Sequence, residues 1–469
     1  MIGIPRSRHR FGALMLIATL AFSLAAHDAA TAGAAAVPGK PPGSAKIFPY
    51  AIHSKTLANG FKMFVIPTDH PGLISYYTVV RTGSRNEVEP GHSGFAHFFE
   101  HMMFRGTERY TSEQYNDILK SLGADSNAFT TDDWTCYHMT ATAAALEKMM
   151  DLESDRFQHL KYAEPEFQKE SRAVLGEYNK NASSPFQMME EKIMDTAFTT
   201  HTYKHTTMGF LKDIEDMPNQ YEYSRQFFDR FYRPENCVLV VVGDVKEEAV
   251  FRLAEKYYGG WKHGGYVSQI PAEPAQSEPR SVDVKWQSPT MPYLMIGFKS
   301  PAYDPKQKDA PALDLIGQLG FGQTSPLYKK LVLEKQIVEF IQGDAGSHRD
   351  PNLFSIVTRL KSKDPKVMDA VRTEINATLE ELRTQPVDAK RLADVKSAIK
   401  YGMAMSLDTT DEIAIAVAQA VELTGDPDSI NQLFRTYDGL TSADLTEVAK
   451  KVLVTNGRTD LSLTEEVKK

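Results

Sequence analysis

The alternation of hydrophobic and polar residues divides the chain into segments typical of strands and helices. In the first half, the turn Asn59-Gly60 separates two apolar runs in LANGFKMFVIP, which predicts a β-hairpin. The runs LISYYTVV (73–80) and CVLVVVGDV (237–245) are apolar enough for buried strands. The stretch NAFTTDDWTCYHMTAT (127–142) is rich in Thr and aromatic residues, and we expect it to form one long strand.

Helices are predicted between these strands, and one of them has clear capping signals. The segment TSEQYNDILKSLG begins at Thr111, an N-cap residue with Gln114 in the capping-box position, and Gly123 marks its end. Two longer segments, AALEKMMDLESDRFQHL (144–160) and EPEFQKESRAVLGEYNKN (164–181), have the apolar spacing of helices. The first half therefore mixes strands and helices.

The second half repeats this order of elements. A predicted strand, YLMIGFKSP (293–301), is followed by a predicted helix, APALDLIGQLGF (310–321). A second strand, FSIVTRLK (354–361), precedes long helices over 365–382 and 388–405. We therefore expect an α+β fold of two homologous domains, each an antiparallel sheet packed with helices.

Composition suggests where the domains meet. Residues 264–280 contain two glycines and three prolines, as is typical of a linker. We expect a first domain over 47–263 and a second domain over 281–469. The Gly- and Pro-rich segment 33–46 is predicted to be a flexible leader.

The first 32 residues have the pattern of a secretory signal peptide. Three arginines among residues 6–10 precede an uncharged apolar run, and Ala30-Thr31-Ala32 fits a cleavage signal. The apolar run is shorter than the roughly 20 residues that span a bilayer, and no later stretch is apolar enough to span one. We expect cleavage near Ala32, a mature chain without a transmembrane segment, and a periplasmic or secreted location.

Charge and cysteine content exclude several classes of function. The formal net charge is −8 at pH 7, so nucleic acid is not an expected partner. The two cysteines, Cys136 and Cys237, are too few for a disulfide scaffold or for a cysteine-ligated zinc site. Both lie in strand-like runs, which favours two buried thiols over one disulfide.

The segment HFFEH, from His97 to His101, has the spacing of a metal site. Residues four apart on a helix share one face, so both imidazoles can reach one ion. Glu100 borders the same face, where it can take a proton from a water without being a ligand. This combination suits a metallopeptidase, although H-x-x-E-H strings also arise in unrelated helices.

A catalytic zinc site also needs a third protein ligand. The predicted helix 164–181 offers Glu170 and Glu177, which lie two turns apart on one face. One of them can bind the metal while the other orients a ligand from behind. A rival pair, His201 and His205, has no acid between its members, and we interpret it as part of a surface loop.

The run GFAHFFEHMMFRGT (94–107) resembles the zinc-motif region of the pitrilysin/insulinase family, the inverted zincins that carry H-x-x-E-H. Other segments between residues 47 and 460 resemble the family in the same order. They are NGFKMFVIP, GSRNE, SNAFTTDDWT, the helix with the two glutamates, FYRPENCVLVVVGDV and GQTSPLYKKL. This ordered set is far more specific than the five-residue motif and points to a zinc peptidase.

The resemblance implies a role for each candidate residue. The ligands of one zinc ion per chain would be His97, His101 and Glu177. Glu100 would be the general base, and Glu170 would be the supporting acid behind the ligands.

The resemblance also implies a binding site for substrate. The strand around Asn127, Ala128 and Phe129 would line the cleft and hold an extended peptide by strand addition. An ordinary sheet edge is the alternative for these three residues.

One segment of the second half departs from the family pattern. Active members carry an Arg and a Tyr, seven residues apart, that help bind substrate near the scissile carbonyl. In LVLEKQIVE, Val332 and Glu339 stand at these positions. The family builds a four-domain clamshell, and this chain would supply half of it. The resemblance therefore implies a homologous partner chain that supplies Arg and Tyr, with a homodimer as the alternative.

The sequence thus predicts a zinc metalloendopeptidase that cleaves extended or unfolded peptides in an enclosed chamber. The alternatives are a non-catalytic scaffold or core-type subunit of the same fold, and a zinc hydrolase that acts on something other than peptides. The intact H-x-x-E-H motif favours the enzyme over the scaffold.

Overall fold

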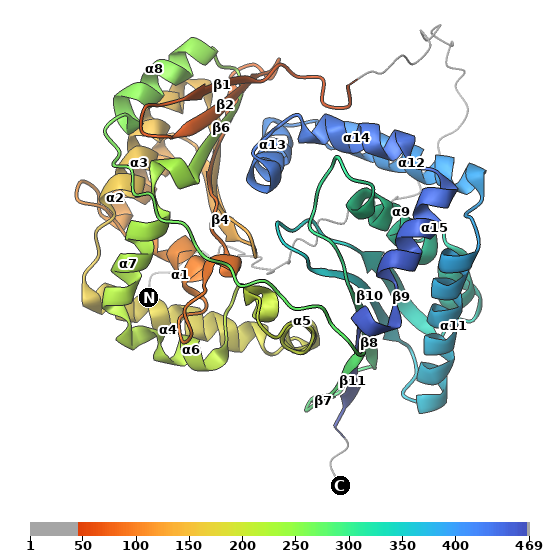
Figure 1. The fold of residues 1–469 in the computed structure, drawn as a ribbon. Helices are drawn as coiled ribbons and strands as arrows, with labels where there is room; N and C mark the ends of the chain where they lie inside the picture. Colours follow the sequence, from red (N-terminus) through yellow and green to blue (C-terminus); the bar gives the residue numbers. More distant parts are fainter. Residues whose placement is uncertain (1–45, 467–469) are drawn as a thin grey trace, which may run out of the picture. The chain divides into compact units, whose positions relative to one another are not determined.

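The computed structural model describes residues 46–466, which are drawn in colour in Figure 1. The predicted signal peptide (1–32) lies outside the described residues, as does the predicted leader (33–46) apart from Lys46. The described residues contain one six-stranded and one five-stranded sheet, and helices pack against both. This arrangement confirms the expected α+β class.

The first half of the chain forms the six-stranded sheet. In order across the sheet, the strands are β1 (His53–Thr56), β2 (Lys62–Pro67), β6 (Cys237–Gly243), β3 (Leu73–Val80), β5 (Thr135–Thr142) and β4 (Asp125–Thr130). The β1–β2 hairpin turns at Gly60, whose φ of 91° favours glycine, as the Asn-Gly signal predicts. Neighbouring strands are antiparallel except for β2 and β6, which are parallel.

The expectation of one long strand over 127–142 is wrong, because the chain reverses after Thr130 and forms the β4–β5 hairpin. In the turn, Thr131 N donates to Trp134 O, and Thr131 Oγ1 accepts from the amides of Asp133 and Trp134. Thr and Asp favour such turns because their side chains bond to nearby backbone groups. The reversal makes β4 an outer strand of the sheet.

The second sheet repeats the strand order of the first. Its strands, in order, are β7 (Arg280–Trp286), β11 (Arg458–Glu465), β8 (Tyr293–Lys299), β10 (Leu353–Leu360) and β9 (Val338–Asp344). They correspond to β2, β6, β3, β5 and β4, and the parallel pair, β7 with β11, recurs at the same place. The shared order supports two homologous domains. Between Gly264 and Pro279 the described chain forms no helix or strand, and the predicted domain boundaries remain predictions.

The helices predicted in the first half are present, whereas four further helices between residues 185 and 258 were not predicted from the sequence. They are α1 (Phe95–Met102), α2 (Ser112–Ser121), α3 (Leu146–His159), α4 (Glu164–Asn181), α5 (Pro185–Ala197), α6 (Leu211–Asp216), α7 (Tyr221–Phe231) and α8 (Glu247–Tyr258). The predicted capping box of α2 is present, since Thr111 and Gln114 each accept the other's backbone N–H. Gly123 follows with a φ of 62°.

The second half adds several helices that the sequence pattern did not predict. Its helices are α9 (Asp309–Phe321), α10 (Pro326–Tyr328), a π-helical turn (Lys329–Glu334), α11 (Pro365–Thr384), α12 (Ala389–Met405), α13 (Thr410–Thr424), α14 (Ser429–Gly439) and α15 (Ser442–Val452). The unpredicted elements include α13, α14 and α15. Within residues 46–466, no helix has both the length and the apolar character needed to cross a bilayer.

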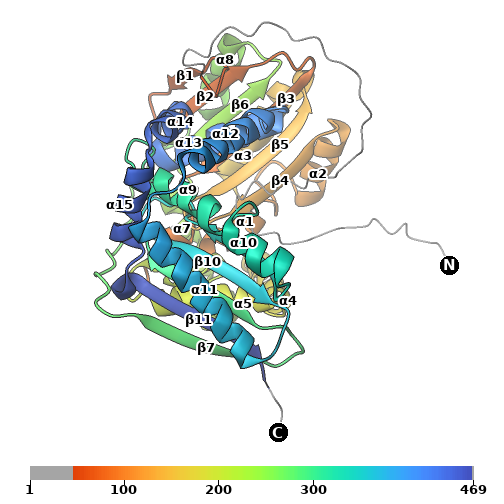
Figure 2. The same cartoon turned by 90° about the vertical axis from the view of Figure 1, so that its right-hand side faces the viewer.

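Each sheet is packed against a helix from the other half of the chain. Helix α13 contacts β3 and β6 of the first sheet, while α5 contacts β7 and β11 of the second. Figures 1 and 2 both show α13 beside the first sheet. Polar contacts support this packing, since Tyr77 Oη donates to Asp411 Oδ1 at 2.7 Å and the hydroxyls of Ser75 and Thr410 lie 2.8 Å apart. The exchange joins both halves in one compact unit.

The two cysteines are buried and free, as the sequence favours. Cys136 contributes to the hydrophobic cluster that includes α13, whereas Cys237 belongs to the cluster behind α1, on the other face of the sheet. Burial raises the pKa of both thiols. Two thiols on opposite faces of a sheet cannot form a disulfide without moving the strands.

Candidate metal centre

The N-terminus of α1 is fixed by a buried carboxylate. Glu87 accepts hydrogen bonds from Gly94 N and Ala96 N, both at 2.7 Å, and so satisfies two amides that have no partner within the helix. Gly94 has a φ of 93°, and a Cβ there would lie 2.5 Å from Ile214 Cδ1. The helix start is therefore determined by a glycine and a glutamate close to it in the sequence.

The candidate ligands come from two helices in contact, α1 and α4. His97, His101 and Glu177 each offer one donor atom, and these three atoms lie within 4.8 Å of one another. Glu177 Oε2 is 3.8 Å from His97 Nε2 and 3.3 Å from His101 Nε2. No other group of this kind occurs within residues 46–466.

These distances fit a zinc ion. Ligand atoms bound at about 2.0–2.2 Å in a tetrahedral arrangement lie roughly 3.4 Å apart, close to both distances from Glu177. Two imidazoles and one carboxylate are also the donor set of known catalytic zinc sites, which leave the fourth position open. Glu177 therefore needs only small shifts, and the two histidine nitrogens, within 4.8 Å of each other, would move closer to bind one ion.

Glu170 lies behind His101 rather than beside the other two donors. Its Oε1 is 3.0 Å from His101 Nδ1, and its Oε2 is 2.6 Å from Arg105 Nη2. A carboxylate on Nδ1 leaves Nε2 as the atom that faces a metal. Burial raises the pKa of Glu170, but the bonds from His101 and Arg105 outweigh it and lower the pKa overall.

The charges of the ligands suit a cation. Burial lowers the pKa of His97, which favours the neutral imidazole that a metal requires. Burial also acts to lower the pKa of His101, but the carboxylates of Glu170 and Glu177 raise it to about 9. Contact with His101 in turn lowers the pKa of Glu177 to about 2. A bound cation would take the place of the proton that His101 shares with these carboxylates.

Glu100 lies on the same helix and is held by a side chain outside the predicted set. Thr130 Oγ1, at the end of β4, donates to Glu100 Oε2 at 2.7 Å. The carboxylate is half-buried, and within residues 46–466 it makes no other hydrogen bond. It is therefore oriented by the neighbouring sheet and remains available as a base.

The residues Asn127, Ala128 and Phe129 lie on β4, which contacts α1. Among the described strands, β4 pairs only with β5, so its other edge has unpaired backbone groups. Ala128 is buried on the α1 side, while Phe129 packs on the opposite face near Trp134. The arrangement suits strand addition, and an ordinary sheet edge remains the alternative.

The interpretation of His201 and His205 as a surface loop is wrong. Their exposed fractions are 3% and 7%, and a short 3-10 turn separates them. His201 Nε2 is 3.0 Å from Asp350 Oδ2 of the second half, and His205 Nδ1 is 3.1 Å from Thr206 O. The segment is buried because it lies where the two halves meet, a contact that local sequence does not reveal.

The segment with Val332 and Glu339 has an unusual backbone. Val332 lies in the π-helical turn and packs against the core, and Gln336 just after the turn has a φ of 52°. Glu339 is the second residue of the outer strand β9 and pairs with Arg359 at 2.8 Å. Neither side chain offers a hydrogen-bond donor to a substrate carbonyl.

Sequence reasoning missed three residues that position the candidate site. They are Glu87 at the start of α1, Arg105 beside Glu170, and Thr130 beside Glu100. All three stand within segments that resemble the family, which is a signal of importance but not of a role. Their partners become visible only in three dimensions.

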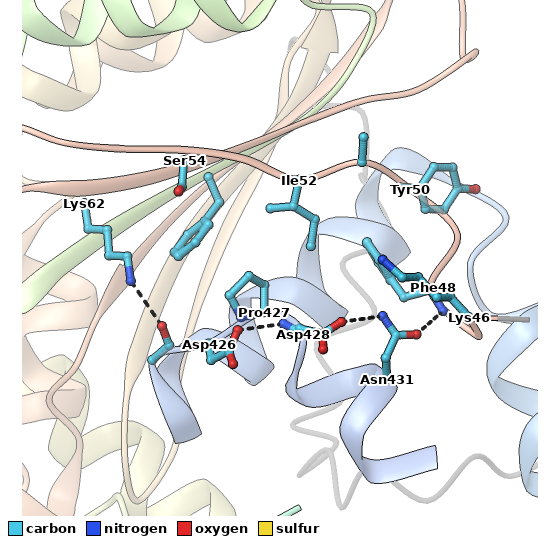
Figure 3. A pocket seen from close by; sticks show the side chains of 13 residues that line it. Lys46, Phe48, Tyr50, Ile52, Ser54, Lys62, Asp426, Pro427, Asp428 and Asn431 are labelled. Carbon is cyan, nitrogen blue, oxygen red and sulfur yellow. Dashed lines mark hydrogen bonds between the residues drawn. The ribbon is translucent and has the colours of Figure 1, made fainter. Parts of the chain in front are cut away.

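A separate cavity of about 680 Å³ lies between the N-terminal strand region and the turn after α13 (Figure 3). Lys62 Nζ donates to Gly425 O at 3.2 Å, and Phe48 N donates to Asn431 Oδ1 at 3.0 Å across it. None of the candidate metal-site residues lines this cavity. It therefore belongs to the contact between the halves and not to the metal centre.

Two family models match the chain in succession. A model described as "Insulinase (Peptidase family M16)" matches residues 64–210, which include all the candidate metal-site residues. A model described as "Peptidase M16 inactive domain" matches residues 220–399. The order of the two matches follows the order of the two sheets.

Individual relatives agree with these matches. A zinc protease, PqqE, from Helicobacter pylori is 29% identical over 85% of this chain and 89% of its own length. The crystal structure of a protease from Helicobacter pylori superimposes with a TM-score of 0.83 at 27% identity, over 88% of this chain and 100% of that chain. The periplasmic protease PqqL from Escherichia coli has the same fold, with a TM-score of 0.71 at 18% identity, but the match spans 88% of this chain and 47% of PqqL.

Proposed function

The chain belongs to the insulinase family of peptidases, family M16, and on this premise we propose that it is a zinc-dependent endopeptidase. The observation that carries the proposal is the group His97, His101 and Glu177, with Glu100 on the same helix. A related protein is described as a zinc protease, which supports zinc as the metal. Many metals bind such donors, so zinc specificity rests on this relationship.

The proposed mechanism assigns a separate task to each residue. His97, His101 and Glu177 would hold one zinc ion, and Glu170 would orient His101 through Nδ1. When bound, zinc lowers the pKa of a water molecule and polarises a peptide carbonyl. Glu100 takes the proton of the attacking water and delivers it to the nitrogen that leaves.

The proposed substrate is an extended or unfolded peptide. It would add to the free edge of β4 at Asn127–Phe129, with hydrogen bonds to the backbone that do not depend on side chains. The scissile bond would then lie beside α1, because α1 contacts β4. This placement supports peptides over other substrates of zinc hydrolases.

The proposed active species contains a second, homologous chain. Val332 and Glu339 provide no donor near the scissile carbonyl, and a partner chain would supply the Arg and Tyr in their place. PqqL is about twice as long as the matched region, which fits two such halves closing over one peptide. A homodimer is the alternative. The signal-like N-terminal pattern supports action in the periplasm or outside the cell.

The metal assignment is tested by elemental analysis. The purified chain should hold about one zinc ion, and His97→Ala and Glu177→Ala should each lose it. His205→Ala serves as the matched control, since this buried histidine is not in the donor group, and it should keep the metal. Full occupancy in both ligand variants would reject the site.

The catalytic assignment is tested by Glu100→Gln. Glutamine is nearly isosteric but cannot accept the proton, so peptide hydrolysis should fall about 10²-fold or more while zinc and fold are retained. Each assay is run with and without the homologous partner chain. Normal turnover by the zinc-loaded variant would place the base elsewhere, and a wild-type chain inactive under all these conditions would favour a scaffold.

A further inference from the structure

We propose that Thr130 is a positioning residue for Glu100, so that the strand that receives the peptide also orients the base. The inference rests on the proposed function. Its first observation is the 2.7 Å hydrogen bond from Thr130 Oγ1 to Glu100 Oε2. A hydroxyl that donates to a carboxylate is a charge-assisted bond, about twice as strong as a neutral one.

The direction of this bond follows from the neighbouring groups. Thr135 Oγ1 lies 3.5 Å from Thr130 Oγ1 and donates to Thr82 O at 2.9 Å. Glu100 as a carboxylate can only accept, so Thr130 supplies the proton of the 2.7 Å bond, and its contact with Thr135 is much longer. With Oε2 held, Oε1 is the oxygen that remains for the water.

The backbone of β4 places Thr130 correctly. Side chains alternate along a strand, so Thr130 shares a face with Ala128, which is buried against the cluster behind α1. A shift of β4 by one residue would turn Phe129 toward Glu100 instead. The hydrogen bond thus depends on the register of the hairpin.

The turn after Thr130 is anchored to the second half of the chain. Asp133 accepts from Tyr203 Oη at 2.7 Å and from Arg349 N at 3.1 Å, and its carboxylate is 3.7 Å from Arg85 Nε. These contacts hold the end of β4 where the two halves meet. A peptide added to β4 would rest on a strand whose far end is already fixed.

The consequence is a link between substrate binding and catalysis. Thr130 does not touch the zinc ligands, so its removal should leave the metal in place. The carboxylate of Glu100 would then lose the one hydrogen-bond partner that it has among residues 46–466, and it would rotate between conformers. Misplacement of a reacting group by about 1 Å can cost about 10²-fold in rate.

Three variants test the inference. Thr130→Val removes the hydroxyl at nearly constant volume, and Thr130→Ser keeps it. Ser126→Ala is the matched control, because Ser126 is on the same face of β4 and its hydroxyl is buried without a hydrogen-bond partner. Zinc content and thermal stability of each variant show whether the fold and the metal are kept.

The first readout needs neither zinc nor activity. Crystal structures of the zinc-free chain should show one conformer of Glu100 in the wild type and in Thr130→Ser, and several in Thr130→Val. A single, unchanged Glu100 conformer in Thr130→Val would overturn the inference. So would disorder of Glu100 in the control Ser126→Ala.

The second readout is kinetic. Thr130→Val should lower kcat by about 10–100-fold with little change in KM, and Thr130→Ser should recover most of the loss. In a Glu100→Gln background, Thr130→Val should cause no further loss, because the two residues act together. Additive losses would indicate a merely structural role. If the Glu100→Gln variant is fully active, the proposed function fails. If Glu100→Gln is inactive but Thr130→Val has normal activity, only the role of Thr130 is rejected.

Discussion

Glu170 provides a test of the metal centre that does not require a substrate. It is 3% exposed and accepts from His101 through one oxygen and from Arg105 through the other. In Glu170→Gln, the amide oxygen can serve only one of these donors, and the NH₂ group faces the other. If the NH₂ group meets His101, the ring must accept at Nδ1 and carry its proton on Nε2, the atom that faces Glu177.

The expected loss follows from this choice of tautomer. A ring protonated at Nε2 cannot bind a metal through that atom, and loss of such a supporting partner typically costs 10–100-fold in metal affinity. The range corresponds to about 1.4–2.8 kcal/mol of binding free energy. Glu170 also loses its charge next to Arg105, so the fold is checked in parallel by thermal unfolding.

The measurement is a competition titration of zinc against a chromophoric chelator at fixed pH. Glu164→Gln is the matched control, because Glu164 is an exposed residue at the start of the same helix. Its zinc affinity should equal that of the wild type. Equal affinities for Glu170→Gln and the wild type would refute the assigned role of Glu170. An equal loss in both variants would mean that the effect arises from α4 as a whole.

Three further predictions concern the core, pH and the partner. Arg156 is fully buried among aromatic rings and pairs with Glu153 at 2.7 Å. Arg156→Met leaves Glu153 without its partner, so the free energy of unfolding measured in urea should fall by about 3–5 kcal/mol. A fall of less than about 1 kcal/mol would contradict this. Burial raises the pKa of Glu190 from 4.5 to about 8, so the folded state keeps a proton that the unfolded state releases between these pH values. The free energy of unfolding should therefore fall as pH rises from 5 to 8, and that of Glu190→Gln should fall less steeply. Equal slopes for the two proteins would contradict the raised pKa of Glu190. Val332 and Glu339 stand where the family resemblance places two hydrogen-bond donors, so the isolated chain should be about 10²-fold or more less active than the chain with its homologous partner. Peptide cleavage is measured together with the mass of the species in solution. Full activity of a pure monomer would disprove the pairing.

Much of the fold could be predicted because its signals are local. The Asn59-Gly60 turn, the capping box of α2 and the bounds of α4 depend on residues within a few positions of one another. The spacing of His97 and His101 likewise depends only on the geometry of one helix. The reversal at Thr131 was missed because its β-favouring residues outweighed the turn-forming Thr and Asp in the local pattern.

The open choice between Glu170 and Glu177 shows where local reasoning ends. Two turns of helix place both on one face, and spacing alone treats them alike. In the structure, Glu177 Oε2 faces the Nε2 atoms of both histidines, while Glu170 meets His101 from behind at Nδ1. Their positions differ because α4 crosses α1 at a fixed place, which depends on packing between helices.

The sequence by itself determined the α+β class, the repeat of one unit, the helix with H-x-x-E-H and the family to which the chain belongs, because helix period, turn chemistry and motif spacing act over a few residues. Only the tertiary structure decided that α5 and α13 pack across the two halves, that His201 is buried against Asp350, and that Thr130 holds Glu100. Each of these contacts joins residues that are distant in the chain or on different elements. They form because apolar faces and buried polar groups must find partners somewhere in the folded chain, and no local pattern specifies which partner that is.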